Sequence, residues 1–235
     1  MSVFAIADLH LSLDTNKPMD VFGKRWDGYV DKLQQHWQET VSKDDTVIIP
    51  GDISWSTYLE ECFKDFDFIN RLNGNKIILK GNHDYWWTTA SKLSAYIQKN
   101  SFNTISFLHN DAFLMEGISI CGSRSWITPK TDNASAEDVK IYNRELARIR
   151  LSLDYANKMF PGTEKIVFVH YPPFSNQKEL DMAFINLVCE YDVKRIVYGH
   201  LHADAHAFSI NESVDGIEFK LVSADFINFK PHFLY

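Results

Sequence analysis

The sequence has few of the residues that mark secreted, zinc-thiolate or membrane proteins. Among its 235 residues there are only three cysteines, Cys62, Cys121 and Cys189, which are widely spaced and form no CxxC pair. Such a set predicts neither a disulfide framework nor a thiolate zinc site. The first apolar run, residues 3–7, is too short for a signal sequence, and no apolar run approaches membrane-spanning length. We therefore expect a soluble, cytoplasmic protein with no membrane partner.

Dense clusters of like charge are also missing. The formal net charge is −7, and no stretch carries five or six charges of one sign in succession. Proteins that bind nucleic acid through its phosphates usually present a basic face, so the charge balance disfavours a nucleic-acid partner. Repeats, low-complexity segments and linkers are lacking, whereas 45% of the residues are hydrophobic, enough for a sizeable core. We expect one domain over residues 1–235; an oligomer is compatible with the sequence, which indicates no particular state.

Short apolar runs alternate with segments whose apolar residues recur every three or four positions. The runs predict strands, and the periodic segments predict helices. Strands that alternate with helices are typical of parallel sheets built from βαβ units. In the N-terminal half the expected elements are, in chain order, the strand 3–7, the helix 26–41, the strand 46–49, the helix 59–72, the strand 76–79 and the helix 88–99.

The middle of the chain has a different pattern. Three short strands with tight links, at 104–108, 112–115 and 118–121, predict a meander or hairpin. A long amphipathic helix is expected next, over 135–158, and it opens with a Ser-x-x-Asp capping pair. This helix within the segment 123–160 could cover the sheet, act as a lid or form a dimer surface.

The alternation of strands and helices then resumes. We expect a strand over 165–169, a helix over 177–191 and a strand over 195–198. The tail, residues 206–235, resembles antiparallel strands that turn at Asp215-Gly216. The simplest fold is α/β, with two sheets packed face to face.

Polar side chains that can bind metals follow five of the expected strands. Ligands of α/β sheets bind at the carboxyl ends of strands, so we expect these groups to converge. Carboxylates, an amide oxygen and imidazoles without a thiolate suit Mn²⁺, Fe or Zn²⁺ better than Ca²⁺. The set is too large for one tetrahedral site but suffices for two ions if one carboxylate bridges them. In chain order the candidates are Asp8, His10, Asp52, Asn82, His170, His200 and His202.

The order of these motifs resembles that of the calcineurin-like metallophosphoesterase superfamily. The matching stretches are DLH, GD, GNHD, a single histidine and GHLH, spread over residues 8–202. The resemblance implies a four-layer α/β/β/α sandwich of the metallo-dependent phosphatase type. It also implies two divalent metal ions per chain, Mn²⁺ or Fe with Zn²⁺ as the alternative. It assigns Asp8, His10, Asp52 and His202 to one metal, and Asp52, Asn82, His170 and His200 to the other, with Asp52 as the bridge.

The resemblance also assigns roles within the GNHD stretch. A hydroxide that bridges the metals would attack phosphorus in line, and His83 would be the general acid that protonates the leaving oxygen. Asp84 would hold the His83 ring. The arginine of the GDxVDRG motif of Ser/Thr protein phosphatases is missing from residues 51–55, which read GDISW. The chain therefore looks more like the small prokaryotic phosphoesterases.

Two further features bear on the substrate. Arg124 follows the strand 118–121, and its guanidinium could bind a phosphate through two N–H groups. An apolar wall for a base or an aryl group could come from the aromatic residues Trp55, Tyr85, Trp86, Trp87, Trp126 and Phe174.

Two further acidic residues could act behind the metal ligands. Asp204 and Asp225 are candidates to hold these ligands in place by hydrogen bonds.

These observations predict an enzyme that hydrolyses a small phosphoester with two metal ions. Phosphodiesters are slightly favoured over phosphomonoesters, because aromatic residues flank the expected site and few cations are available for a dianion. The alternative is a non-catalytic metal-binding scaffold with the same fold, for which His83 and Asp84 would have no use. A metal-dependent hydrolase of another bond is a second alternative.

Overall fold

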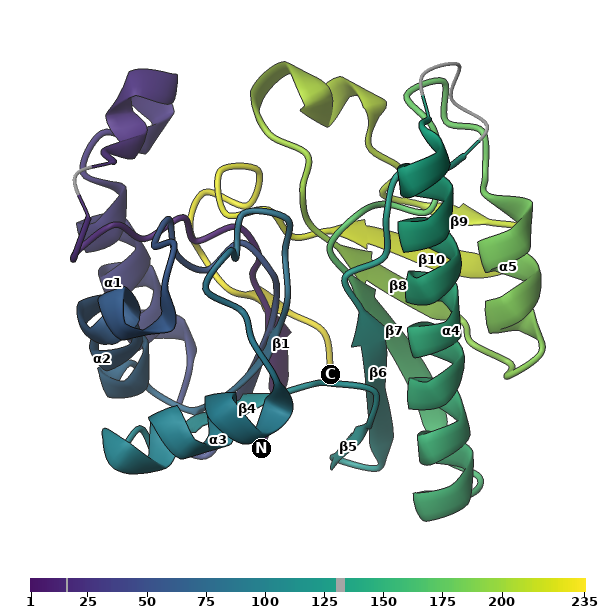
Figure 1. Ribbon diagram of the computed structural model, residues 1–235, viewed down its shortest axis with the longest axis horizontal. Helices are drawn as coiled ribbons and strands as arrows, with labels where there is room; N and C mark the ends of the chain where they lie inside the picture. Colours follow the sequence, from purple (N-terminus) through teal and green to yellow (C-terminus); the bar gives the residue numbers. More distant parts are fainter. Residues whose placement is uncertain (16, 130–133) are drawn as a thin grey trace.

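Two β-sheets packed face to face form the centre of the molecule, and helices cover the outer side of each (Figure 1). The structure is a computed structural model that describes residues 1–15, 17–129 and 134–235. The arrangement confirms the predicted four-layer α/β/β/α sandwich.

The first sheet has the strand order β11-β1-β2-β3-β4. The strands β1 to β4 run parallel, and β11 pairs with β1 in the antiparallel sense. The helices α1, α2 and α3 lie on the outer side of this sheet (Figure 1). The bounds are β1 Val3–Ala5, β2 Thr46–Pro50, β3 Asn75–Leu79, β4 Ile105–Phe107, β11 His232–Phe233, α1 Tyr29–Thr40, α2 Phe63–Arg71 and α3 Ala90–Lys99.

The second sheet has the strand order β5-β6-β7-β8-β10-β9. Its central strands are parallel, and both edge strands, β5 and β9, are antiparallel to their neighbours. The helices α4 and α5 cover its outer side (Figure 1). The bounds are β5 Phe113–Met115, β6 Ile118–Ser123, β7 Glu164–Val169, β8 Arg195–Tyr198, β9 Ser213–Val214, β10 Ile217–Leu221, α4 Ala136–Met159 and α5 Met182–Cys189. Short 3₁₀ helices span Met19–Phe22, Lys24–Trp26, Leu59–Cys62 and Ala203–Phe208.

Strands that are buried on both faces explain the continuous apolar runs of the sequence. In β2, Val47 and Ile49 pack against the first helix layer, whereas Ile48 points between the sheets. In β7, Val167 packs toward α4 and α5, and Ile166 points between the sheets. Successive side chains of a strand alternate between its faces, so each strand supplies two apolar layers.

The expected strands in the middle of the chain divide between the two sheets. The strands β5 and β6 form the predicted hairpin, but β4 pairs in parallel with β3 in the first sheet. A three-strand meander is therefore wrong. Leu108, between β4 and β5, is buried among the side chains that separate the sheets. The chain crosses from one sheet to the other at this point, and strand propensity alone does not reveal such a crossing.

Other expected elements fit with small changes. The helix α5 begins at Met182, later than expected, because the Asp181 carboxylate accepts from the backbone N–H groups of Ala183 and Phe184 and so caps it. The predicted capping pair opens α4, and this helix packs on the second sheet, which makes it a cover. The hairpin of β9 and β10 turns at residues 215–216 as predicted.

Cys62, Cys121 and Cys189 are all free. Within the described ranges, no helix combines the length and the apolar character needed to cross a bilayer.

Candidate metal centre

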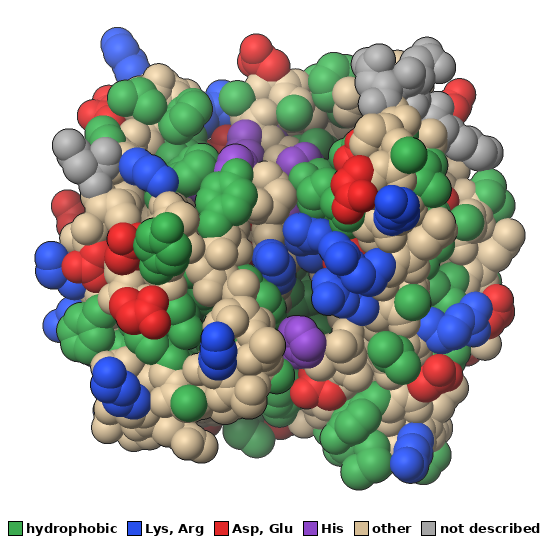
Figure 2. Space-filling view, viewed as in Figure 1, with side chains coloured by type: hydrophobic (Ala, Val, Ile, Leu, Met, Phe, Trp, Pro, Cys, Tyr) green, Lys and Arg blue, Asp and Glu red, His purple; other side chains and the backbone are tan. Residues whose placement is uncertain are grey.

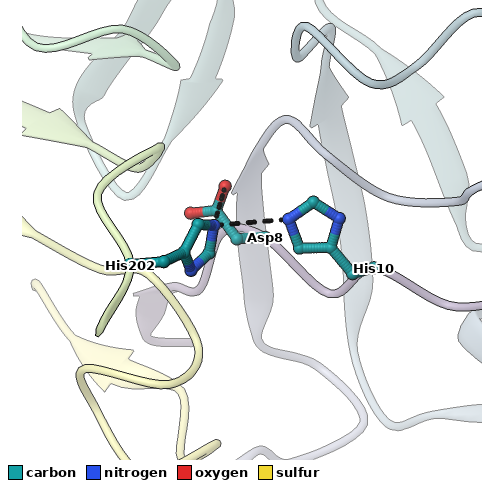
Figure 3. Close-up of side chains that lie close together, drawn as sticks. All are labelled: Asp8, His10 and His202. Atoms are coloured by element: carbon teal, nitrogen blue, oxygen red, sulfur yellow. Dashed lines mark hydrogen bonds and ion pairs between the residues drawn. The ribbon is translucent and has the colours of Figure 1, made fainter. Parts of the chain in front are cut away.

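The seven predicted ligands converge at the ends of β1, β2, β3, β7 and β8. A first cluster contains Asp8, His10 and His202 (Figure 3). The Nε2 atoms of His10 and His202 lie 3.3 Å apart, and His202 Nε2 is 3.4 Å from Asp8 Oδ1. Three donor atoms therefore face a common point, although the residues come from opposite ends of the sequence.

A second cluster surrounds the side-chain oxygen of Asn82. His170 Nε2 lies 2.6 Å from Asn82 Oδ1, and His200 Nδ1 lies 3.0 Å from the same oxygen. The two ring nitrogens are 3.3 Å apart. This places one amide oxygen and two imidazoles together, as the sequence predicts.

Asp52 lies between the two clusters. Its Oδ2 atom is 3.6 Å from His10 Nε2 on one side and 3.4 Å from His170 Nε2 on the other. Its Oδ1 atom accepts a hydrogen bond from the His83 backbone N–H at 2.8 Å. The carboxylate is thus held in the position that a bridging ligand would need.

The charges and lone pairs of this cluster fit divalent cations. Burial lowers the pKa of His10 and of His170, and it lowers the pKa of His200 to about 3, so these rings are neutral and offer lone pairs. Burial and the neighbouring Asp8 raise the pKa of Asp52. Against the effect of burial, Asp8 and Asp225 raise the pKa of His202 to about 10, so this ring carries a proton that a bound cation would replace. Two buried carboxylates beside imidazoles are a donor set that suits cations of the Mn²⁺, Fe or Zn²⁺ type.

Four of the candidate ligands have an unusual backbone. The φ angles are +62° for Asp8, +45° for His10, +54° for Asp52 and +72° for His200. All four lie in the left-handed region, which residues other than glycine seldom adopt. Backbone hydrogen bonds of 2.9 Å from Asp8 N to Gly51 O and from His10 N to Asp52 O hold these loops together. Strain of this kind collects at functional sites, where the surrounding structure enforces it.

The glycine before Asn82 has a steric reason. A Cβ atom on Gly81 would lie 2.1 Å from Asp52 Oδ1 and 2.3 Å from Asp52 N. A side chain there would push Asp52 away, so only glycine allows the loops after β2 and β3 to touch.

Asp225 supports the first cluster from behind. His202 donates from Nδ1 to Asp225 Oδ1 at 2.8 Å, which orients the ring so that its Nε2 atom faces Asp8 and His10. Asp225 Oδ2 accepts from Arg25 Nη1 and from the Ala203 backbone N–H. Asp204, the other candidate, is exposed.

Replacing Asp225 with alanine is expected to lower the affinity for Mn²⁺ by about 10–100-fold, because the His202 ring loses the partner that orients it. A titration of metal-free protein with Mn²⁺ measures the change, and excess Mn²⁺ should restore occupancy. Asp204→Ala is the matched control. An unchanged affinity in Asp225→Ala would contradict a supporting role.

His83 lies at the edge of the centre and outside the ligand clusters. Its ring centroid is 4.5 Å from that of Trp55 and 5.6 Å from that of His10. Its Nδ1 atom is buried and has no hydrogen-bond partner among the described residues. Burial, followed by the neighbouring His170, lowers the pKa of the ring. The ring is therefore free to interact with a ligand at the centre.

The expected contact of Asp84 with the His83 ring is wrong. The Asp84 side chain is fully buried, and both of its oxygens accept hydrogen bonds from the two ligand-bearing loops. This carboxylate ties the end of β2 to the end of β3 and acts as a positioning residue. The donors are the backbone N–H groups of Asp52, Ile53, Ser54 and Gly81 and the indole N–H of Trp86.

Asp84→Asn is expected to lower the free energy of unfolding by about 2–4 kcal/mol, because the amide replaces one accepting oxygen by a donor that faces other donors. Urea denaturation measures the loss. Asp44→Asn, at an exposed position, is the control and should leave the midpoint unchanged. Equal midpoints for the two variants would contradict the clamp.

The predicted substrate residues are only partly placed at the centre. The Arg124 guanidinium makes no hydrogen bond or ion pair with the seven ligand candidates among the described residues. Its Nη2 atom is 3.4 Å from Glu145 Oε1, and its guanidinium carbon is 4.3 Å from the centroid of the Trp126 ring. Trp86 and Phe174, at 2% and 6% exposure, belong to the core and not to an aromatic wall. Trp55 lies beside His83, as a wall residue would.

Comparison with known families identifies the class of protein. The sequence model of the calcineurin-like phosphoesterases matches residues 1–204. The fold and the Asp/His clusters together define a metal-dependent phosphoester hydrolase. The chain belongs to the calcineurin-like phosphoesterase family. No curated protein matches it at a significant level.

Solved structures with a similar fold share little sequence with this chain. The phosphopantetheinyl hydrolase PptH from Mycobacterium tuberculosis has 15% identity and a TM-score of 0.56, over 99% of this chain and 95% of that one. The protein TT1561 of Thermus thermophilus has 10% identity and a TM-score of 0.57, over 99% and 97%. A protein of unknown function from Aquifex aeolicus, AQ665, has 14% identity and a TM-score of 0.51, over 99% and 95%. At these identities the likeness shows the fold alone.

Proposed function

We propose that the protein hydrolyses small phosphodiesters with two divalent metal ions, Mn²⁺ or Fe in preference to Zn²⁺. The observation that carries this proposal is the position of Asp52 Oδ2, within 3.4–3.6 Å of a ring nitrogen in each donor cluster. A carboxylate shared in this way suits a pair of ions about 3.5–4 Å apart. Phosphomonoesters are the second candidate substrate class.

The candidate ligands would form two metal sites that share Asp52. When bound, the two ions would supply a bridging hydroxide as nucleophile and stabilise charge on the phosphoryl oxygens. The loops that carry the ligands are fixed by Asp84 and by the close approach at Gly81, so little reorganisation is needed on binding. One site would use Asp8, His10, Asp52 and His202, and the other Asp52, Asn82, His170 and His200.

His83 would protonate the leaving oxygen. Its backbone N–H is anchored on Asp52, and its ring stands against Trp55 next to the donor atoms. The buried Nδ1 atom has no protein partner within the described ranges, so no protein group fixes which ring nitrogen carries the proton. An anionic phosphoester beside the ring would favour the protonated form and so offset the effect of burial on its pKa.

The charge at the centre favours a diester. In the part of the chain that the structure describes, no Lys or Arg side chain is hydrogen-bonded or ion-paired to any of the seven ligand candidates. A monoester dianion carries one more negative charge than a diester and would need more compensation. The exposed Tyr85 and the half-buried Trp55 flank His83 and would accept an apolar ester group.

Metal reconstitution tests the proposed function. The protein is stripped of metal, reloaded separately with Mn²⁺, Fe²⁺, Zn²⁺ or Mg²⁺, and assayed with an aryl phosphodiester and an aryl phosphomonoester. A phosphopantetheinyl ester belongs in the same plate because a protein of this fold is a phosphopantetheinyl hydrolase. We expect metal-dependent turnover that is faster for the diester. Two bound ions without turnover of any ester would favour the scaffold alternative.

A further inference from the structure

A cavity of about 460 Å³ lies beside the metal centre, and cationic side chains are among the residues that line it. We call it the basic pocket, and it is lined by Lys80, Arg124 and Arg148 together with Glu145, Trp87 and His109. In the space-filling view, Lys and Arg side chains gather around a hollow in the middle of this face, next to histidine side chains (Figure 2). Such a concentration of positive charge stands out in a chain with a formal net charge of −7.

The protein neutralises the three cations of the basic pocket only in part. Glu145 is its one acidic lining residue, and a single oxygen, Oε1, serves both Arg148 at 2.7 Å and Arg124 at 3.4 Å. Lys80 is half-buried and has no hydrogen bond or ion pair with any residue that the structure describes.

A cation that is partly shielded from water gains from a negative or carbonyl partner. Lys76 has such partners in the carbonyl oxygens of Leu72 and Gly74. The half-buried Lys80 has none among the described residues, and its ammonium still reaches solvent. The Arg124 Nε atom is buried and has no hydrogen-bond partner in the described ranges. An anionic ligand would satisfy both groups.

The basic pocket shares its wall with the metal centre. Lys80 is two residues before Asn82, so their Cα atoms are at most about 7 Å apart. The Arg124 carbonyl accepts from the backbone N–H groups of His170 and Tyr171 at 3.1 and 3.0 Å. One small molecule could therefore occupy the metal centre with one phosphoryl group and the basic pocket with a second anionic group.

We propose that the basic pocket binds a phosphate group of the substrate other than the one that is cleaved. This inference rests on the proposed function, because it specifies the substrate class as a phosphodiester that also carries a terminal phosphate. Several N–H donors around a cavity suit the three oxygens of a phosphate, and a carboxylate is the alternative anion.

The test uses p-nitrophenyl phosphodiesters of linear alkanediols with two to six carbons. Their far end carries a phosphate, a carboxylate or a hydroxyl, and the measured quantity is the ratio of kcat/KM between anionic and hydroxyl ends. We expect the phosphate end to raise kcat/KM about tenfold at the best chain length, as one charged contact can do. A ratio of one at every length, or a larger gain for the carboxylate end, would overturn the proposal.

Variants assign the gain to the pocket. Lys80→Gln removes no hydrogen bond or ion pair with a described residue and should reduce the ratio to about one to three. Arg148→Gln, which also loses the contact with Glu145, should do the same. Arg150→Gln is the matched control, because Arg150 lies on the same helix but is exposed and pairs with Glu190 at 2.8 Å. It should keep the wild-type ratio. A full ratio in Lys80→Gln would overturn the proposal.

A binding measurement separates this proposal from the proposed function. If none of the esters is cleaved with any metal, the proposed hydrolysis fails, and the pocket is then tested by calorimetric titration with butane-1,4-diol bisphosphate. Tighter binding to the wild type than to Lys80→Gln would support the pocket. Equal binding to the two proteins, or none, would overturn it.

Discussion

Replacing Asp52 by asparagine is expected to empty both metal positions and to lower kcat/KM by about 10³-fold or more. The amide can still accept the His83 backbone N–H at Oδ1, so the loop keeps its shape. It lacks the negative oxygen that lies between His10 Nε2 and His170 Nε2. Elemental analysis of the purified variant and its turnover of an aryl phosphodiester measure the two losses.

Controls separate loss of the bridge from loss of the fold. Asp44→Asn makes the same chemical change at an exposed position and should keep full metal content and activity. The circular dichroism of Asp52→Asn should match that of the wild type. A variant that binds two ions and turns over normally would show that Asp52 is no bridge.

His83→Ala is expected to keep both ions but to lose about 10²–10⁴-fold in kcat for esters with an alkyl leaving group. The loss should be much smaller, about tenfold or less, with p-nitrophenol as the leaving group, because its oxygen leaves without help from an acid. The ring does not belong to either donor cluster, and its Nδ1 atom has no partner in the described ranges. The dependence on the leaving group distinguishes a proton donor from a residue that merely shapes the site.

The control for His83 is His36→Gln. His36 lies on α1, and among the described residues its ring is hydrogen-bonded to the carbonyl oxygen of Asn228. It should behave like the wild type with both leaving groups. Equal losses of His83→Ala with alkyl and p-nitrophenyl esters would argue against general acid catalysis, and full activity with both would remove His83 from the mechanism.

The convergence of the seven candidate ligands could be predicted from the sequence because each candidate follows an apolar strand. Parallel strands such as β2 and β3 end at one edge of a sheet, so Asp52 and Asn82 had to meet once their strands were recognised. The contact between these two loops also explains Gly81, because a side chain at this position would collide with Asp52. The local sequence pattern was therefore sufficient to predict the position of a residue that directly follows its own strand.

The contacts between distant loops could not be predicted in this way. Asp84 is next to His83 in the sequence, which suggested that its carboxylate holds the His83 ring. The carboxylate instead accepts hydrogen bonds from backbone N–H groups of another loop, those of Asp52 and Ile53. The basic pocket likewise needs the end of β3 beside α4, an arrangement that depends on how the two sheets stack. The transfer of β4 to the first sheet has the same origin, because sheet membership is a tertiary property.

Anomalous diffraction from crystals of the Mn²⁺-loaded protein tests the central claim most directly. We predict two peaks about 3.5–4 Å apart, one beside Asp8, His10 and His202 and the other beside Asn82, His170 and His200, with Asp52 Oδ2 between them. A single peak, or two peaks that do not share Asp52, would contradict the two-metal centre.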